Sequence, residues 1–109
     1  MVNLIKLSKQ HEKLFPRATP ESQFWKLEEE IKEIKTAPNF EEQIKELSDI
    51  IIVCGGLYRW FPETAMSVMY FYLDHPAADL IESEVKRKWE INLKRKWAWN
   101  GKTYHHVHD

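Results

Sequence analysis

The sequence predicts an all-α protein, a bundle of four to five helices with a short extended C-terminal tail. Three observations lead to this prediction. Apolar residues recur at intervals of three and four along most of the chain, which is the period of an amphipathic helix. Proline or asparagine stands at the breaks between these stretches, where it can begin or end a helix. No stretch before the tail alternates like a strand.

The composition agrees with one globular domain over residues 1–109. Hydrophobic residues make up 43%, charged residues 30%, and the formal net charge is −1. A chain with so small a net charge is not expected to have the wide basic surface that binds a nucleic-acid polymer. The first ten residues lack the apolar core of a secretory signal, and no apolar run is long enough to span a bilayer. Cys54 is the only cysteine, so neither a disulfide nor a cysteine metal site is expected. We therefore expect a cytoplasmic protein without a membrane partner.

The first two helices are predicted at residues 4–15 and from Pro20 onward. Pro16 ends the first. Thr19 offers a hydroxyl cap to the second, and Pro20 occupies its first helical position. The core-facing stripe of the second helix is Phe24, Leu27, Ile31 and Ile34.

The third helix is capped by Asn39, with Glu42 three residues on in a capping-box arrangement. Its run 50–57 is apolar on every side, which indicates a buried helix. Gly55 and Gly56 each cost about 1 kcal/mol relative to alanine inside a helix. Either the helix breaks there or another backbone approaches closely, and close packing is the preferred interpretation.

Two further helices are predicted at residues 63–73 and 77–97. The apolar side chains of the first face the core or another subunit: Met66, Met69, Tyr70 and Leu73. Ile81 and Val85 set the inward face of the second. Residues 100–108 contain a turn signal and an extended piece, whose histidines are expected in solvent or at a subunit contact.

Acidic residues face one another across the break between the second and third helices. In an antiparallel hairpin, Glu33 and Glu46 lie equally far from the break, and so do Glu30 and Asp49. The two pairs are about one helical turn apart, and helices packed roughly 8–10 Å apart bring such side chains to a common point. Four carboxylates there repel strongly unless cations neutralise them. The spacing predicts a hard-metal site with these four ligands; the alternative is a solvated acidic face.

The ligand set and the last helix together suggest a phosphorylated substrate. All-oxygen ligands, without cysteine or Glu-x-x-His, favour Mg²⁺, or Mn²⁺, over zinc or di-iron. Lys88, Asn92 and Arg95 fall on nearly one bearing of the last helix. One interpretation is that the last helix extends beyond the bundle and these side chains are exposed to solvent. The other is that they point at an anion held by the metal. The economical reaction is hydrolysis, with a carboxylate as the base.

The acidic motif resembles a known signature. Glu29-Glu30-x-x-Glu33, twelve residues and then Glu46-x-x-Asp49 is similar to that of the MazG-like all-α nucleoside triphosphate pyrophosphohydrolases. This superfamily includes the dimeric dUTPases and dCTP pyrophosphatases. Two further motifs are similar to those of short phage and bacterial members. One is Gln23-x-x-Lys26, just before the acids. The other is Lys88-x-x-x-Asn92-x-x-Arg95, which is followed by Trp97 and a Gly-x-x-Tyr-His ending. The resemblance covers about residues 20–106.

The resemblance implies cleavage of a nucleoside triphosphate between its α- and β-phosphates, giving the monophosphate and pyrophosphate. By position, Glu30, Glu33, Glu46 and Asp49 would bind Mg²⁺. Glu29 or Glu33 would orient or deprotonate the attacking water.

The substrate contacts also follow from the resemblance. Lys88, Asn92 and Arg95 would hold phosphates, and Lys26 would either join them or pair with Glu30. Gln23, Trp25 and Phe24 would stack on and read the base. The family works as dimers or dimers of dimers, so a homo-oligomer is expected. The aromatic-rich segment 60–75 departs from many members, which leaves the base preference open.

Two other functions fit the same sequence. One is a bundle that binds a nucleotide without hydrolysing it. The other is a structural helical assembly, in which Lys88 forms salt bridges with the acids.

Overall fold

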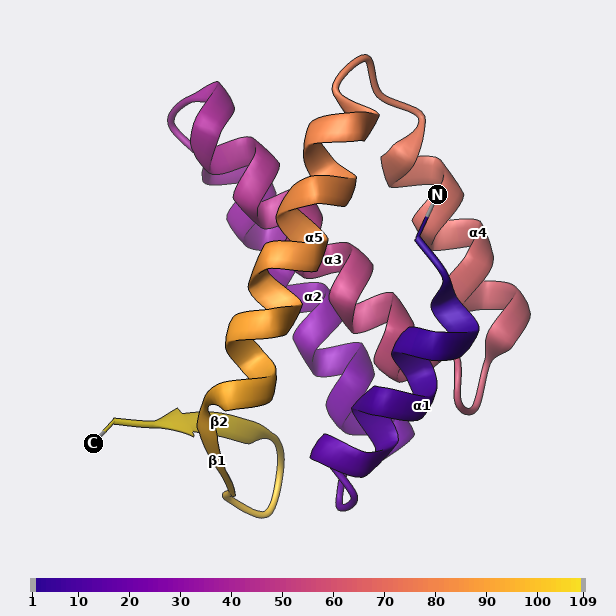
Figure 1. Ribbon diagram of the computed structural model, residues 1–109, viewed down its shortest axis with the longest axis vertical. Coiled ribbons are helices and arrows are strands. Elements are labelled where there is room, and N and C mark those ends of the chain that lie inside the picture. Colours follow the sequence, from indigo (N-terminus) through magenta and orange to yellow (C-terminus); the bar gives the residue numbers. More distant parts are fainter. Residues whose placement is uncertain (1, 109) are drawn as a thin grey trace.

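The computed structural model describes residues 2–108, which form five α-helices followed by a two-stranded sheet (Figure 1). The helices are α1 (Leu4–Leu14), α2 (Pro20–Thr36), α3 (Phe40–Leu57), α4 (Pro62–Leu73) and α5 (Ala78–Lys94). The strands β1 (Lys96–Trp99) and β2 (Tyr104–Val107) pair antiparallel. The predicted all-α bundle is confirmed. Within the described residues, no helix is both long and apolar enough to cross a membrane.

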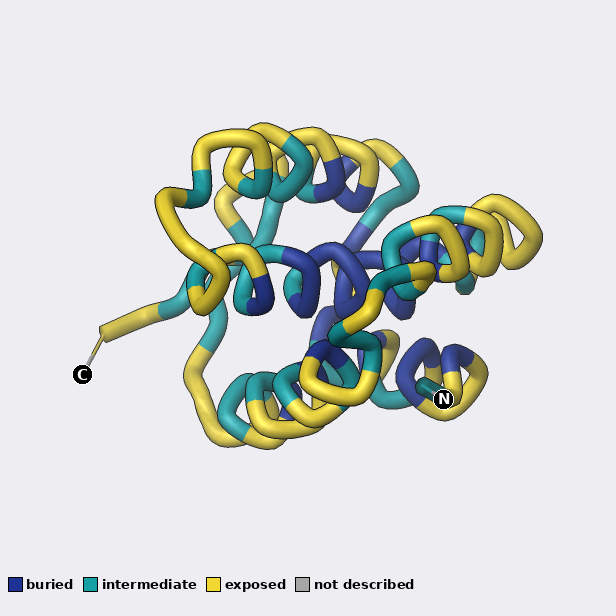
Figure 2. Tube along the Cα trace, turned by 90° about the horizontal axis from the view of Figure 1, so that it is seen from above, coloured by how far each residue is buried: buried dark blue, intermediate teal, exposed yellow. Residues whose placement is uncertain are grey.

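Helix α3 is the centre of the molecule. It contacts α1, α2, α4 and α5, and the other helices surround it (Figure 1). Its run 50–57 is buried at every position, and Ile50, Ile51 and Leu57 are completely inaccessible. In Figure 2 the buried positions concentrate along this central segment, while the surrounding helices turn exposed faces outward. A helix that is apolar all round is therefore the core of this bundle, as predicted.

Side-chain caps fix where α2 and α3 begin. The Thr19 hydroxyl accepts from the backbone N–H of Ser22, and the Ser22 hydroxyl oxygen accepts from the backbone N–H of Thr19. The Asn39 side chain accepts from the backbone N–H of Glu42 at 2.9 Å. The Glu42 carboxylate accepts a bond from Lys45. Both predicted N-caps form, although the Glu42 carboxylate bonds Lys45 instead of completing the predicted capping box with Asn39. The Asn39 cap fixes where α3 begins after the turn, and thereby the depth at which its acids face those of α2.

The two adjacent glycines of α3 allow α1 and α2 to approach closely. The helix runs through them without a break. A Cβ at Gly55 would lie 2.5 Å from Cγ of Leu7 on α1. A Cβ at Gly56 would lie 2.3 Å from Oε1 of Gln23 and 2.6 Å from Nε2 of His11. Close packing without a helix break is confirmed, but side chains of α1 and α2, rather than another backbone, fill the space beside the glycines.

The last helix is shorter than predicted. It ends at Lys94 rather than at residue 97, because Arg95 takes extended backbone angles and β1 follows at once. Trp97 lies opposite His106 and Trp99 opposite Tyr104 across the strand pair. These pairs supply backbone bonds and ring contacts that a longer helix would lose.

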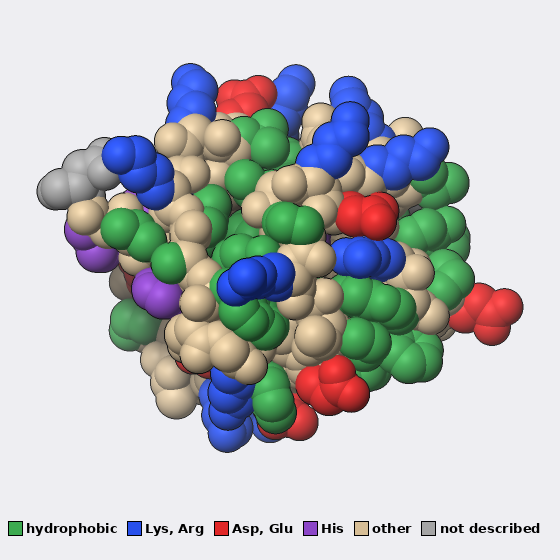
Figure 3. Space-filling model, turned by 90° about the horizontal axis from the view of Figure 1, so that it is seen from below, with side chains coloured by type: hydrophobic (Ala, Val, Ile, Leu, Met, Phe, Trp, Pro, Cys, Tyr) green, Lys and Arg blue, Asp and Glu red, His purple; other side chains and the backbone are tan. Residues whose placement is uncertain are grey.

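Large hydrophobic side chains also remain exposed. From the side of the molecule on which the β-hairpin lies, hydrophobic side chains are visible among Lys and Arg (Figure 3). On and beside α4, the exposed fractions reach 38% for Met66, 42% for Phe61, 45% for Tyr70 and 73% for Phe71. Met69 of the same helix is buried. Helix α4 therefore uses one side for the core and leaves an apolar side uncovered.

Candidate functional site

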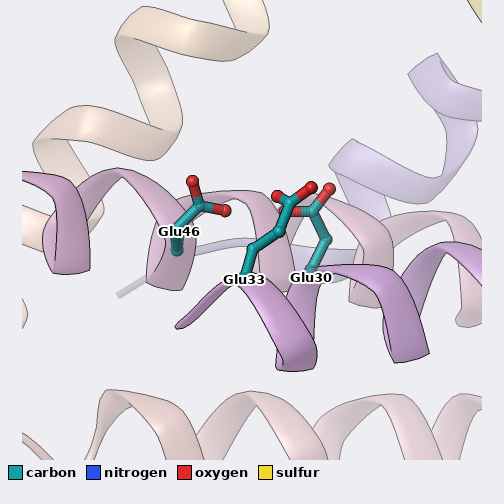
Figure 4. A group of neighbouring side chains, drawn as sticks. All are labelled: Glu30, Glu33 and Glu46. Atoms are coloured by element: carbon teal, nitrogen blue, oxygen red, sulfur yellow. The ribbon is translucent and has the colours of Figure 1, made fainter. Parts of the chain in front are cut away.

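Three of the four predicted metal ligands gather between α2 and α3. One carboxylate oxygen each of Glu30, Glu33 and Glu46 lies within 4.8 Å of the other two. Figure 4 shows Glu30 and Glu33 rising from one helix and Glu46 from its neighbour, with the carboxyl groups turned toward one another. The antiparallel hairpin produces this arrangement because Glu33 and Glu46 lie at the same distance from its tip.

The cluster is partly removed from water. Glu30 Oε2 and Glu46 Oε2 are buried, and neither has a hydrogen-bond partner in the described chain. Burial raises the pKa of Glu30 to about 9, and the negative charges of Asp49 and Glu33 contribute to the rise. Burial is also the main reason why the pKa of Glu46 is raised. Without a cation, the cluster therefore retains protons near neutral pH that a divalent ion would displace.

The fourth predicted ligand, Asp49, has a partner from α5. Lys88 Nζ donates to Asp49 Oδ2 at 2.9 Å and to the backbone oxygen of Lys45 at 3.0 Å. Burial raises the pKa of Asp49, and the hydrogen bond from Lys88 opposes this rise. Lys88 was predicted to hold phosphate or, in a structural assembly, to form salt bridges with the acids; the structure shows its ion pair with Asp49.

The two remaining charged predictions on α2 pair with each other. Lys26 Nζ lies 3.6 Å from a carboxylate oxygen of Glu29, and the Glu29 side chain is 58% exposed. Of the two residues proposed to activate water, Glu33 lies in the cluster and Glu29 lies outside it. Lys26 pairs with Glu29 rather than with Glu30.

A hollow of about 210 Å³ opens beside the cluster. Its wall includes Glu30 and Asp49 from the predicted metal site. The wall also includes four predicted substrate contacts: Gln23, Lys26, Asn92 and Arg95. Asn92 is half-buried, whereas Arg95 is exposed at the edge. The polar side of α5 therefore faces a site as well as solvent.

The predicted aromatic base contacts lie elsewhere. Trp25 is 42% exposed, and the Lys102 ammonium lies 4.2 Å from the centroid of its ring. Phe24 contacts Phe61, with ring centroids 5.5 Å apart. Of the three residues predicted to touch a base, only Gln23 lines the hollow.

The hollow also contains residues for which the sequence suggested no role. Its aromatic side chains are Phe15, Trp97 and Tyr104, and His11 lies in its wall. In the sequence His11 stands at helical spacing from Leu4 and Leu7, and a histidine on such an apolar face was the one available signal. Trp97 and Tyr104 could not be placed, because the hairpin that carries them was predicted partly as helix.

Comparison of this chain with protein-family models, curated proteins and solved structures finds no match. The chemistry of the site is therefore read from its own residues. Clustered carboxylates can hold a hard divalent cation, and nearby Lys and Arg can hold an anion. The adjoining aromatic hollow can hold a flat ring.

Proposed function

We propose that the protein is a Mg²⁺-dependent nucleoside triphosphate pyrophosphohydrolase, which converts a (d)NTP to the (d)NMP and pyrophosphate. The observation that carries the proposal is the convergence of Glu30, Glu33 and Glu46, with two buried oxygens that lack partners. The resemblance of the acidic motif to MazG-like enzymes supplies the reaction.

The donor set fits Mg²⁺, with Mn²⁺ as an alternative. Carboxylate oxygens are the ligands that these hard cations prefer, and unpartnered buried oxygens need a positive charge. Asp49 completes the proposed ligand set. Bound there, Mg²⁺ would neutralise the carboxylates and polarise the phosphoryl oxygens of the substrate.

The chain supplies the base and the phosphate contacts. Glu33 is the proposed base, because it is in the cluster and more exposed than Glu30. It accepts a proton from water as the water oxygen bonds to a phosphorus of the α–β bridge. The bridging bond then breaks and pyrophosphate leaves. Lys26, Asn92 and Arg95, around the same hollow, are proposed to bind the phosphates.

The test is a panel of (d)NTPs with Mg²⁺, with pyrophosphate release coupled to inorganic pyrophosphatase. Glu33→Gln should lower kcat by about 10²–10⁴-fold, the usual range for a lost general base. Glu46→Gln should also abolish most of the turnover. Glu28→Gln is the matched control, since Glu28 is exposed on the same helix. No pyrophosphate from any nucleotide, with Glu46→Gln indistinguishable from wild type, would overturn the proposal.

One observation favours a second candidate, a structural helical assembly. In the ion pair between Lys88 and Asp49, a side chain of the protein itself balances the charge of one of the acids. In that case Mg²⁺ should leave the melting temperature unchanged, since only a ligand that binds the folded state raises it. A thermal shift with a nucleotide, but without turnover, would instead indicate a non-hydrolysing nucleotide-binding bundle.

We also propose that the protein forms a homo-oligomer. The uncovered apolar side of α4 supports this, because exposed clusters of large hydrophobic residues mark interaction sites.

A further inference from the structure

The hollow beside the acids has a buried floor and a charged rim. His11, Ser22 and Gln23 belong to the floor, with exposed fractions of 6%, 1% and 6%. Lys26 and Arg95 stand at the more accessible rim. Since a buried anion needs a compensating charge, the uncharged floor does not suit a phosphate group. It suits a neutral group that forms hydrogen bonds.

His11 is the most informative group in this floor. Its Nε2 lies 2.6 Å from the position that a Cβ of Gly56 would take, so one edge of the ring reaches the backbone of α3. Burial lowers its pKa to about 4, with a smaller effect from the charge of Arg59, so the imidazole is neutral at physiological pH. A neutral imidazole offers one N–H donor and one acceptor nitrogen. A buried neutral imidazole in the wall of a hollow can therefore bond the polar edge of a ligand.

Gln23 lies next to His11 and adds a second donor and acceptor. Its Oε1 and the Nε2 of His11 approach the same bare point of α3, where Gly56 has no Cβ. The Gln23 amide nitrogen reaches Ser22 Oγ only at 3.4 Å, near the limit for a hydrogen bond. The two side chains therefore bring polar atoms to adjacent positions in the wall of the hollow.

Aromatic rings form the side of the hollow. The Phe15 ring centroid lies 5.0 Å from that of Trp97 and 4.9 Å from that of Tyr104. Both hairpin residues are fixed in place. Trp97 Nε1 donates to the backbone oxygen of Asn92, and the Tyr104 hydroxyl accepts from the backbone N–H of Arg17. Rings fixed in this way form a surface for a flat ligand.

We propose that this hollow holds a one-ring heterocycle, the pyrimidine base of the substrate. His11 and Gln23 bond the polar edge of the base, and Phe15, Trp97 and Tyr104 contact its ring. The identity of the ring as a nucleobase rests on the proposed function, because the rim of the hollow carries the proposed phosphate contacts. The size follows from the volume: a cavity of about 150 Å³ holds benzene, and this hollow measures about 210 Å³.

The proposal changes the expected base contacts. Trp25, predicted as a stacking residue, is outside the hollow, and the C-terminal hairpin provides the aromatic surface instead. His11 joins Gln23 as a residue that determines base specificity.

The experiment uses nucleosides without metal, so that neither phosphate nor catalysis contributes to binding. Cytidine, uridine, adenosine and guanosine are titrated into the full chain, and the imidazole C–H signal of His11 is followed by NMR. The pyrimidine nucleosides should shift this signal and bind about tenfold or more tightly than the purine nucleosides. Gln23→Met keeps the side-chain length, removes the amide and should weaken pyrimidine binding about tenfold. Gln43→Met, at an exposed position of α3, is the matched control and should bind as wild type does.

Each outcome separates this inference from the proposed hydrolysis. The inference is overturned if no nucleoside shifts the His11 signal, or if purine nucleosides bind as tightly as pyrimidine nucleosides. Both measurements need only the wild-type chain. Pyrimidine binding without turnover of any triphosphate would support the hollow as a base site and contradict the proposed hydrolase activity. Turnover of triphosphates with an unperturbed His11 signal would support the hydrolase activity and contradict the base site.

Discussion

Neighbouring carboxylates of this site differ in what balances their charge. Glu30 and Glu46 each bury an oxygen that no group in residues 2–108 bonds, whereas Asp49 accepts a bond from Lys88. The charges of Glu30 and Glu46 therefore have to be balanced by protons or by an added cation, whereas the charge of Asp49 is balanced by the ammonium group of Lys88. This difference gives two predictions for single residues.

The first concerns the pH dependence of stability without metal. Glu30 keeps its proton in the folded chain up to a pKa of about 9, against an ordinary value of 4.5. Between these values the folded state binds more protons than the unfolded state, so stability falls as pH rises. The lowered pKa of His11 acts oppositely, but only between about 4 and 6.5. The melting temperature in EDTA should therefore fall from pH 6.5 to pH 9, and the rise caused by Mg²⁺ should grow over the same interval.

Glu30→Gln identifies the group responsible. Its melting temperature in EDTA should change less with pH than that of wild type and should exceed it at pH 9. Glu28→Gln should follow wild type, because Glu28 is exposed on the same helix. A wild-type melting temperature that rises across this interval would contradict the prediction.

The second prediction concerns Lys88→Met, which keeps most of the apolar stem and removes the ammonium group. Asp49 loses its bond and stays partly buried, so the free energy of unfolding in EDTA should fall by about 1.5–3 kcal/mol, the usual range for a charged hydrogen bond. Urea denaturation measures the loss. The stabilisation by Mg²⁺ should be larger than in wild type, because the site then has no cation of its own.

Lys86→Met is the control for this variant, since Lys86 is exposed on the same helix. It should match wild type with and without Mg²⁺. If Lys88→Met and wild type are equally stable in EDTA, the ion pair does not contribute to the free energy of unfolding, and the prediction is wrong.

At the scale of helices, the contact between α1 and α3 depends on a missing side chain. Gly55→Ala improves helix propensity by about 1 kcal/mol. The new Cβ lies 2.5 Å from Cγ of Leu7, which is buried, and overpacking costs about 1–3 kcal/mol. We expect a net loss of stability, measured by urea denaturation. In the Leu7→Ala background the same substitution should be harmless or stabilising, so additive effects of the two changes would refute the close contact.

What the sequence could predict follows from the range of the interactions. The caps at Thr19 and Asn39 and the buried run 50–57 depend on neighbours in the chain, and they were predicted correctly. The depth at which Glu33 faces Glu46 follows from the helix rise alone.

Interactions between distant parts of the chain could be predicted only in part. Salt bridges between Lys88 and the acids were one of the alternatives, but no periodicity identifies Asp49, 39 residues away, as the partner. The change from α5 to β1 was missed because residues 95–97 continue a helical pattern, and the cross-strand partner of Trp97 lies beyond a turn at Gly101, with φ 92°. The place of His11 in the wall of the hollow appears only once α1, α2 and α3 are in place.

At the scale of the whole molecule, the apolar side of α4 predicts self-association. Phe71 is 73% exposed, so Phe71→Asp should cost the single chain little stability while disrupting an interface there. Light scattering after gel filtration should give at least twice the chain mass for wild type and the chain mass for Phe71→Asp. Gln43→Asp introduces the same charge at an exposed position of α3, away from this side of α4, and should keep the wild-type mass. A wild-type protein that stays monomeric at high concentration would contradict this prediction.

Two of the acids stand on the same helix as the innermost segment of the bundle. Glu46 and Asp49 precede residues 50–57 by one turn or less, and that segment is sealed from solvent. Amide hydrogens in such a segment exchange only through global opening. Heating should therefore abolish the arrangement of these acids at the same midpoint as the fold itself, without a populated state that is folded but inactivated.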